Sequence, residues 1–245
     1  MGAQRWKPRH RVIRVILRTL IRVGLALLSK LTIEGAENLP DSGPTLVVAN
    51  HFHFADPVIV IRAMPWPLDF IGGSRLPNAP TGVKWLTRLW GTMRVRRGGS
   101  SREALRAAEE TLKAGGILGI FPEGGSWADV LRPPRPGAAY LATRTGACVV
   151  PVGLDGVTDL FSNLLRFRRA RITVRIGVAF GPFEGVPSGR AGREEIDRVG
   201  RVMMERIAEL LPEERRGVLS RDEVIRESAA EAAVYPWERG RGTGR

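Results

Sequence analysis

The side chains best suited to acid–base chemistry stand close together in the stretch 50–56, which reads Asn-His-Phe-His-Phe-Ala-Asp. The chain has only three histidines, and His10 belongs to a basic leader, so His51 and His53 are the candidates. Asp56 stands five positions after His51, a spacing that can bring its carboxylate to the imidazole. Such a pair fixes the histidine tautomer and leaves the other ring nitrogen to take a proton from a hydroxyl group. We therefore predict His51 as a general base oriented by Asp56, with His53 in a structural or supporting role.

Metal binding and thiol chemistry are the alternatives to a general base in this sequence. The His-x-His pattern followed by Asp56 resembles the start of a binuclear metallohydrolase site, but no further histidine follows His53 to complete it. We predict no metal, and a metal-dependent hydrolase using His51, His53 and Asp56 stays the alternative. Cys148, the only cysteine, lies in an apolar run typical of a buried structural thiol.

Two further segments could bring charged groups to the same place. The run Phe121–Gly124, Phe-Pro-Glu-Gly, ends an apolar stretch, so Glu123 would be presented at an edge of the predicted sheet. The segment 91–100 places Arg94, Arg96 and Arg97 before glycines and a predicted helix start. Guanidinium groups and the N–H groups at a helix start together favour phosphate. The alternative for this segment, a solvated basic strand edge, stays open on its sequence alone.

These residues depend for their positions on short apolar runs that alternate with helical stretches from Leu31 onward. The predicted strands are Thr45–Ala49, Asp69–Gly72, Met93–Arg96, Ile117–Phe121, Cys148–Val152 and Ile172–Val178. The predicted helices are Asp56–Ala63, Thr81–Trp90, Ser101–Ala114, Gly137–Thr145 and Arg193–Leu211, with Ser100 and Glu103 as a capping box for the third. This alternation predicts an α/β fold, a single domain with a mostly parallel central sheet covered by helices.

The positive charge of the chain is concentrated at one end. The 245 residues include 38 Lys and Arg against 25 Asp and Glu, a net charge of +13. Eight of the basic residues and none of the acidic ones stand in residues 1–30. With 43% hydrophobic residues and one cysteine, the chain is neither mainly disordered nor a disulfide framework. Because the excess charge is local, we predict no nucleic-acid partner.

The basic leader has helical periodicity. Arg11, Arg14, Arg18 and Arg22 fall within about 80° of one another on a helix, with apolar residues around much of the remaining circumference. Arginines at the centre of a membrane span cost roughly 2.5–3.5 kcal/mol each, which argues against a crossing helix. We predict residues 1–30 as an amphipathic helix lying on a membrane, with its arginines among anionic headgroups. The alternative is an ordinary amphipathic helix packed on the domain.

Four blocks over residues 35–185 resemble the 1-acylglycerol-3-phosphate acyltransferase family, the PlsC-like glycerolipid acyltransferases, in the family's order. They are His51 with Asp56, Gly91 with Arg97 six positions later, Phe121-Pro122-Glu123-Gly124, and the apolar strand around Pro151. One departure stands in the third block, where Gly125, Ser126 and Trp127 replace the usual Thr-Arg-Ser. That family arginine is thought to help hold the acceptor phosphate, so the departure bears on the acceptor, and Arg94, Arg96 or Arg132 could substitute.

The resemblance implies an acyltransferase of phospholipid biosynthesis. It would move a fatty acyl chain from acyl-CoA or acyl carrier protein to the hydroxyl group of a lysolipid, 1-acylglycerol 3-phosphate, giving phosphatidic acid. His51 and Asp56 would be catalytic, and the family uses no metal or prosthetic group. The substrate-binding residues it implies are Gly91, Arg97, Phe121, Pro122, Glu123, Gly124 and Pro151. A different polar-lipid acceptor is the alternative within the class.

The expected organisation follows from these assignments. Residues 1–30 form the membrane-interface helix, residues 31–211 the acyltransferase domain, and residues 212–245 a C-terminal helix and tail. The expected partners are an anionic membrane surface, an acyl thioester donor and a lysolipid acceptor. The expected location is peripheral, on the cytoplasmic face of the cell membrane.

Overall fold

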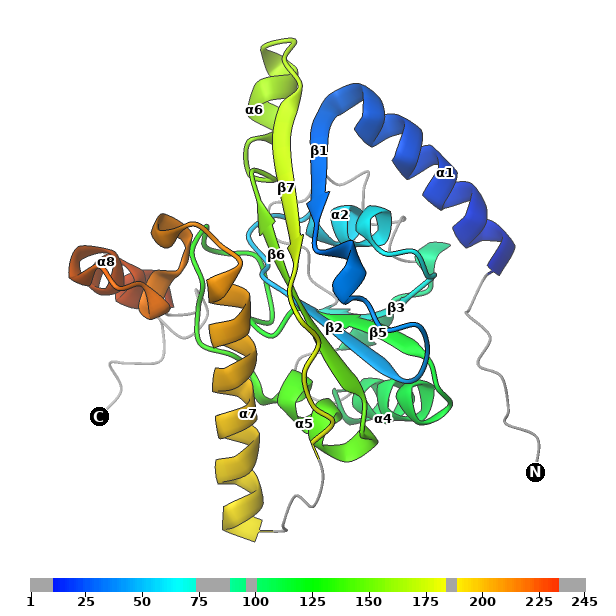
Figure 1. The fold of residues 1–245 in the computed structure, drawn as a ribbon, viewed down its shortest axis with the longest axis vertical. Helices are drawn as coiled ribbons and strands as arrows, with labels where there is room; N and C mark the ends of the chain where they lie inside the picture. The colour runs from blue at the N-terminus through cyan, green and yellow to red at the C-terminus, as the bar shows by residue number, and fades with distance from the viewer. Residues whose placement is uncertain (1–10, 74–88, 96–100, 184–188, 234–245) are drawn as a thin grey trace, which may run out of the picture.

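A seven-stranded sheet lies at the centre of the computed structural model, which describes residues 11–73, 89–95, 101–183 and 189–233 (Figure 1). The strands are β1 (Ser29–Glu34), β2 (Thr45–Ala49), β3 (Asp69–Gly73), β4 (Met93–Val95), β5 (Ile117–Ile120), β6 (Cys148–Asp155) and β7 (Ala170–Ile176). Their order across the sheet is β1-β7-β6-β2-β5-β3-β4, and every neighbouring pair is parallel except β6 and β7. The predicted α/β fold with a mostly parallel sheet is confirmed.

The described helices are α1 (Arg11–Leu28), α2 (Asp56–Ala63), α4 (Ser101–Lys113), α5 (Pro136–Thr145), α6 (Leu160–Leu165), α7 (Gly189–Glu209) and α8 (Glu223–Ala233). Helices α1 and α2 cover one face of the sheet and α4, α5 and α7 the other, while α8 lies apart from it. Single 3-10 turns occupy Ala36–Asn38, Glu213–Arg215 and Gly217–Leu219. Strand β2 and helix α2 have the predicted bounds. Residues 81–88 of the helix predicted at Thr81–Trp90 lie outside the described residues, as does the predicted cap Ser100.

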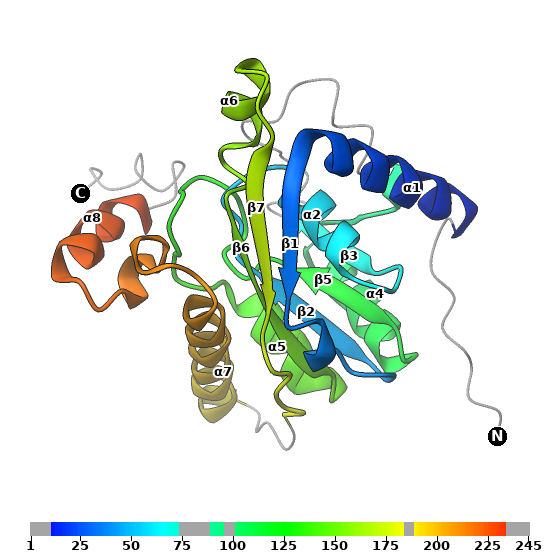
Figure 2. The same cartoon turned by 45° about the horizontal axis from the view of Figure 1, so that its top comes forward.

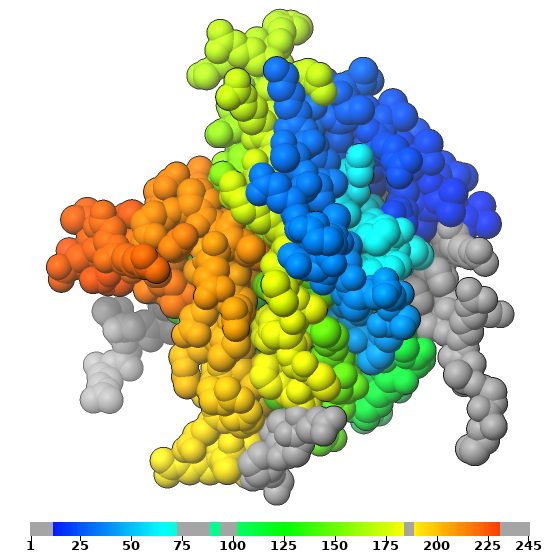
Figure 3. Space-filling view, viewed as in Figure 1, coloured from blue at the N-terminus to red at the C-terminus, as the bar shows by residue number. Residues whose placement is uncertain are grey.

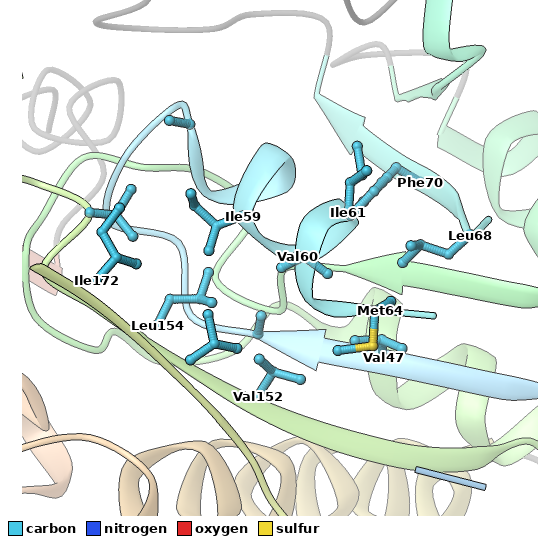
Figure 4. Close-up of a cluster of buried hydrophobic side chains, with 14 of the residues drawn as sticks. Val47, Ile59, Val60, Ile61, Met64, Leu68, Phe70, Val152, Leu154 and Ile172 are labelled. Carbon is cyan, nitrogen blue, oxygen red and sulfur yellow. The ribbon is translucent and has the colours of Figure 1, made fainter. Parts of the chain in front are cut away.

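Alternate residues of β2 supply two separate cores, because successive side chains of a strand point to opposite faces. Leu46 and Val48 pack with α4, α5 and α7 on one face. Val47 and Ala49 pack with α1 and α2 on the other, and Figure 4 shows Val47, Ile59 and Val152 of this second core together. Figure 2 shows the two helical layers on either side of the sheet. The sheet is therefore buried on both faces near the end of β2.

Two elements were not predicted from the sequence. Strand β1 pairs in parallel with β7, Ser29 opposite Ala170, but only Ser29 of its six residues is fully buried. Because most side chains of β1 are not buried, the segment lacks the continuous apolar run that would predict a strand. Helix α6 has six residues, too few to show a helical period. Strand β1 directly follows α1, and α6 leads into β7, the strand that pairs with β1.

Helix α1 lies on the domain with part of its arginine stripe turned inward. Arg14 is 1% exposed, and its guanidinium binds the Asp69 carboxylate, the Trp90 carbonyl at 2.9 Å and the Leu68 carbonyl at 3.3 Å. Arg18 donates to the carbonyls of Met64 and Pro65. The expectation that these two arginines lie among headgroups is wrong, because both satisfy carbonyl acceptors of the domain. Arg22, one turn further along, is exposed.

The outward face of α1 is apolar instead. The inward positions Arg14, Leu17 and Leu25 are buried at helical spacing against the domain. The large apolar side chains left exposed on the other positions are Val12, Ile13, Val15, Ile16, Leu20, Val23, Leu27 and Leu28. Soluble monomers rarely leave contiguous apolar patches of this kind uncovered. The helix thus presents an apolar face to its surroundings and turns Arg14 toward the domain.

Candidate active site

The candidate site begins where the central strand β2 ends. Asn50, the next residue, is buried and exchanges two hydrogen bonds with the backbone of Leu154 on β6, at 2.9 and 2.7 Å. An amide side chain can do this because it carries both a donor and an acceptor. The pair fixes the start of the loop against the neighbouring strand. His51 therefore leaves the sheet from a rigid point at the carboxyl edge of the parallel strands, where α/β proteins bind ligands.

Asp56 joins this loop to helix α2 and meets His51. The Nδ1 atom of His51 lies 3.0 Å from Oδ2 of Asp56, and the same oxygen accepts the backbone N–H of His53 at 2.7 Å. Asp56 is buried and is the first residue of α2, where the helix N-terminus favours a negative charge. With Nδ1 bound to the carboxylate, Nε2 of His51 is the nitrogen left to take a proton. His51 itself is partly exposed.

Glu123 binds the same loop from the other side. Its Oε1 accepts the backbone N–H of His51 at 2.7 Å, and its Oε2 lies 3.2 and 3.3 Å from the backbone nitrogen and Nε of Arg132. The residue is completely buried. The sequence indicated a substrate-binding residue here, but a buried carboxylate has no surface for a substrate. In this structure Glu123 positions His51.

The neighbours of Glu123 shape the wall behind the imidazole. The Phe121 ring stacks on the His51 ring with centroids 4.2 Å apart and planes 22° apart. Pro122 fixes the following turn through its carbonyl, which accepts the N–H of Arg135 at 2.7 Å. Gly124 has a φ of 75°, a left-handed conformation that glycine adopts without strain. Phe121 and Pro122 thus help to place the ring and the carboxylate, while Gly124 is exposed at the turn.

The departure at Gly125, Ser126 and Trp127 forms one packed unit with Arg132. The Trp127 ring lies directly over Gly125 and leaves no room for a side chain there. The guanidinium of Arg132 lies 5.3 Å from the same ring and donates to the Gly125 carbonyl. Arg132 is buried, so it cannot meet a substrate in this structure as a substitute for the family arginine. Its role here is to hold the Glu123 carboxylate, which it binds through its backbone nitrogen and Nε.

The remaining predicted binding residues are spread more widely. Gly91 stands before β4 with a φ of 78°, and Arg97 lies outside the described residues, as do Arg96 and the side chain of Arg94. Pro151 is buried inside β6, opposite Val48 of β2, and its carbonyl accepts the N–H of Gly177 at 2.9 Å. Pro151 is thus part of the sheet that supports the site.

His53 lies in an aromatic cluster. Its ring is 4.4 Å from Phe54 and 5.5 Å from Phe161, and its Nδ1 accepts the N–H of Ala55 at 3.3 Å. Burial is the largest influence on its pKa, which it lowers. Across the described residues no three His, Cys, Asp or Glu side chains are grouped closely enough to hold a metal ion. A metal-dependent hydrolase would need ligands from elsewhere in the chain.

The protonation of Glu123 gives a testable dependence of stability on pH. Burial raises its pKa to about 8, against the lowering effects of Arg132 and of the N–H groups of His51 and Arg132. The folded state therefore holds a proton that the unfolded chain releases near pH 4.5. The free energy of unfolding contributed by Glu123 is expected to fall as pH rises from 4.5 to about 8 and then to level off.

Urea unfolding at a series of pH values checks this, with Glu123→Gln as the matched variant that cannot ionise. The difference in unfolding free energy between wild type and variant isolates this group from all other titrating groups. We expect the unfolding free energy of wild type, relative to that of the variant, to decrease as pH rises. A constant difference across the range would contradict the raised pKa.

Arg132 and Trp127 are the site residues that sequence reasoning did not place. The sequence suggests Arg132 only as a phosphate ligand, and Trp127 only as a departure from the usual block. Ten positions cover Glu123 to Arg132, but they form a loop with no helical or strand period to indicate which side chains face each other. A buried arginine in such a loop does imply an acidic partner, and Glu123 was the near candidate.

This geometry, a histidine–aspartate pair at the carboxyl edge of a parallel sheet, agrees with the comparison of the chain with known families. The family model described as Acyltransferase matches residues 30–155, a span that includes His51, Asp56 and Glu123. The chain belongs to the Acyltransferase family.

Individual relatives carry more specific names. The 1-acyl-sn-glycerol-3-phosphate acyltransferase of Borreliella burgdorferi is 28% identical over 158 residues, which are 62% of each protein. The chloroplastic 1-acyl-sn-glycerol-3-phosphate acyltransferase BAT2 of Brassica napus is 32% identical over 131 residues, 52% of this chain and 38% of the relative. The matched part thus spans less than two thirds of either relative.

A solved structure supports the same relationship. The crystal structure of the 1-acyl-sn-glycerophosphate (LPA) acyltransferase PlsC from Thermotoga maritima matches with a TM-score of 0.56 and 25% identity, over 80% of both chains. No helix within the described residues combines the length and the apolar character needed to span a bilayer.

Proposed function

We propose that the protein transfers a fatty acyl chain from an acyl thioester to the hydroxyl group of 1-acylglycerol 3-phosphate. The observation that carries this proposal is the His51–Asp56 hydrogen bond of 3.0 Å, in a loop held by Glu123 and Asn50. The product would be phosphatidic acid. The relatives named for this activity support the same acceptor.

The reaction needs one base and little acid assistance. Nε2 of His51 takes the proton of the lipid hydroxyl as its oxygen attacks the thioester carbonyl, and Asp56 stabilises the imidazolium that forms. When the tetrahedral intermediate collapses, the carbon–sulfur bond breaks and the thiolate leaves. A thiol has a pKa of about 8.5, so the thiolate is a stable leaving group and finally takes the proton from His51. Acyl-CoA and acyl carrier protein both supply such a thioester.

The positioning residues explain why the pair is effective. Three fixed contacts hold the His51 loop: the Asn50 amide on β6, the Glu123 carboxylate on the His51 N–H, and the Phe121 ring on the imidazole. A base held in one orientation reacts with a bound hydroxyl without reorganisation, which accounts for a large part of enzymatic rates. The acceptor's phosphate would be bound by Arg97 and the segment after Gly91. The buried Arg132 is assigned to the support of Glu123.

The proposed location is peripheral, on the cytoplasmic face of the cell membrane. Lysolipid and phosphatidic acid both reside in a bilayer, so the enzyme must work at its surface. The exposed apolar face of α1, with the exposed Arg22 beside it, suits the boundary between acyl chains and anionic headgroups. This places the apolar side chains of α1, rather than Arg14 and Arg18, in contact with lipid.

The acceptor is tested with purified full-length protein, one acyl-CoA and a panel of lysolipids. We expect thiol release with 1-acylglycerol 3-phosphate, one thiol for each phosphatidic acid formed. Lysophosphatidylcholine, whose phosphate carries a choline, is the matched control and is expected to react slowly. A second arm replaces acyl-CoA by acyl carrier protein to identify the donor.

Each arm can contradict one part of the proposal. Equal rates with both lysolipids would remove the phosphate monoester as the recognised group, which is the point on which Ser126 departs from the family pattern. Thiol release without any lipid product would indicate a thioesterase. Absence of thiol release with every acceptor and both donors would overturn acyl transfer itself.

A further inference from the structure

The segment that joins β6 to β7 ends in an exposed apolar tip. We define the α6–β7 tip as residues 160–169, which contain helix α6 and the turn after it. Leu165 is 83% exposed and Phe167 is 100% exposed, while Phe161 and Leu164 are partly exposed. Figure 3 shows the tip projecting from the body of the molecule. Side chains of this size at the end of a projection do not serve the hydrophobic core.

The backbone at Phe167 makes the choice of this residue unusual. Phe167 has a φ of 52°, the one left-handed non-glycine residue in the described parts of the chain. The N–H of Phe167 donates to the Leu164 carbonyl and that of Arg168 to the Asn163 carbonyl, the pattern of a Schellman motif that ends α6. Glycine is the usual residue at this position because it avoids the steric cost. A fully exposed phenylalanine at this position adds nothing to core packing and is sterically less favourable than glycine, so we expect its ring to have another role.

Cationic side chains alternate with the apolar ones. Arg166 and Arg168 flank Phe167, and Arg171 follows on β7. All three are exposed, and no acidic residue occurs between 160 and 171. Apolar rings with guanidinium groups beside them match the boundary of an anionic bilayer, where the ring enters the acyl region and the cations meet phosphates. A protein partner of ordinary polarity has no comparable requirement for this alternation.

The tip is continuous with the lipid-facing side of α1. Arg169, which begins the return from the tip, donates to the carbonyls of Ala26 and Ser29, at 2.7 and 3.1 Å for two of these bonds. These carbonyls belong to the end of α1 and the start of β1. Figures 1 and 2 both show the tip and the end of α1 on either side of β1 at the same end of the molecule. Arg169 therefore holds the two exposed apolar surfaces next to each other.

The tip also contacts the catalytic loop. The Phe161 ring lies 5.5 Å from His53 and 5.4 Å from Phe54, two residues of the loop that carries His51. The strand before the tip is β6, whose Leu154 backbone binds Asn50 at the start of that loop. The tip thus projects from the edge of the sheet where acyl transfer is proposed to occur.

We propose that the α6–β7 tip is a second lipid-inserting element, in which Leu165 and Phe167 enter an anionic bilayer between the arginines while α1 lies along its surface. The inference deepens the peripheral location proposed above. It gives the membrane two contacts with the protein, and the one at the tip orients the His51 loop toward the lipid from which the acceptor comes.

Flotation of the full-length protein with vesicles tests this without any substrate. The vesicles contain phosphatidylcholine with or without phosphatidylglycerol, and the variants are Phe167→Gly and Leu165→Ser. We expect each variant to bind the anionic vesicles roughly tenfold more weakly, as for the loss of one large apolar contact. The matched control is Val224→Ser on α8, which removes an apolar side chain of similar exposure, 74%, and is expected to bind like wild type.

Thermal melting separates this effect from unfolding. Because glycine suits a left-handed position, Phe167→Gly is expected to melt at the same temperature as wild type or higher while it loses vesicle binding. Unchanged vesicle binding by both tip variants would overturn the proposal even if acyl transfer is confirmed. Concentration-dependent dimers of wild type that Phe167→Gly abolishes, with vesicle binding unchanged, would assign the tip to a second copy of the chain and also overturn it. Failure of the acyl-transfer assay leaves this measurement unaffected.

Discussion

Replacing His51 by alanine is expected to reduce the rate of acyl transfer by about 10²–10⁴-fold, the range typical of losing a positioned general base. The substitution removes the nitrogen that accepts the hydroxyl proton. Among the described residues, no other side chain is hydrogen-bonded to the Asp56 carboxylate and could replace it. The His51 N–H that binds Glu123 belongs to the backbone and stays in the variant. Thiol release and lipid product measured together at saturating acceptor check the effect, and thermal melting confirms that the variant is folded.

Two companion variants define what a loss of activity means. Asp56→Asn keeps an oxygen for the His53 N–H but no longer stabilises the imidazolium, so a loss approaching that of His51→Ala is expected. The double variant is expected to be no slower than His51→Ala, since the two residues act as one unit. His53→Gln is expected to retain most of the activity. An equal loss in His53→Gln and His51→Ala would favour the metal-ligand hypothesis over the base.

Replacing Arg14 by alanine is expected to lower the free energy of unfolding by about 3–5 kcal/mol, the usual cost of breaking a buried ion pair on one side. Asp69 would stay buried without its guanidinium partner, and the carbonyls of Leu68 and Trp90 would each lose a donor. Trp90 would also lose the cation over its ring, which lies 5.0 Å from the guanidinium carbon. Urea unfolding followed by circular dichroism measures the change.

The same helix provides the control for this prediction. Arg22 belongs to the same arginine stripe but is exposed, so Arg22→Ala is expected to change stability by no more than about 0.5 kcal/mol. Replacing both partners, Arg14→Met with Asp69→Leu, is expected to restore much of the stability lost in Arg14→Ala, because no buried charge is then left unpaired. Similar losses in Arg14→Ala and Arg22→Ala would contradict the inward orientation of α1.

The chain order and the residue types were enough to predict the core of the site. Asn50 to Asp56 is a local segment, so the contact between His51 and Asp56 followed from spacing, and the end of β5 placed Glu123 at the same edge of the sheet. The hydrogen bond between Glu123 and the backbone of His51 could not be predicted from the sequence. This bond depends on β2 and β5 lying side by side, which is a fact of tertiary structure with no mark in either segment.

The orientation of α1 shows a second limit. Helical periodicity gives the angle between the arginine stripe and the apolar residues, but not which of them faces the domain. The orientation is determined by Asp69, which lies 55 positions from Arg14 in the sequence and is buried at the start of a strand. A carboxylate in that position requires a cation, and α1 supplies it. The left-handed Phe167 was likewise invisible, since only the closed turn after α6 reveals that glycine would be expected there.

The pairing of β1 with β7 has a consequence for the order in which the protein is made. Residue 29 pairs with residue 170, so the strand that follows α1 can join the sheet only after more than half of the chain has been synthesised. Translation proceeds from the N-terminus, and the partners of Arg14 also emerge later than α1 itself. The newly made helix therefore leaves the ribosome with both its arginines and its apolar side chains uncovered. A nascent chain in that state exposes the apolar face of α1 before the strands that position His51 and Glu123 have come together.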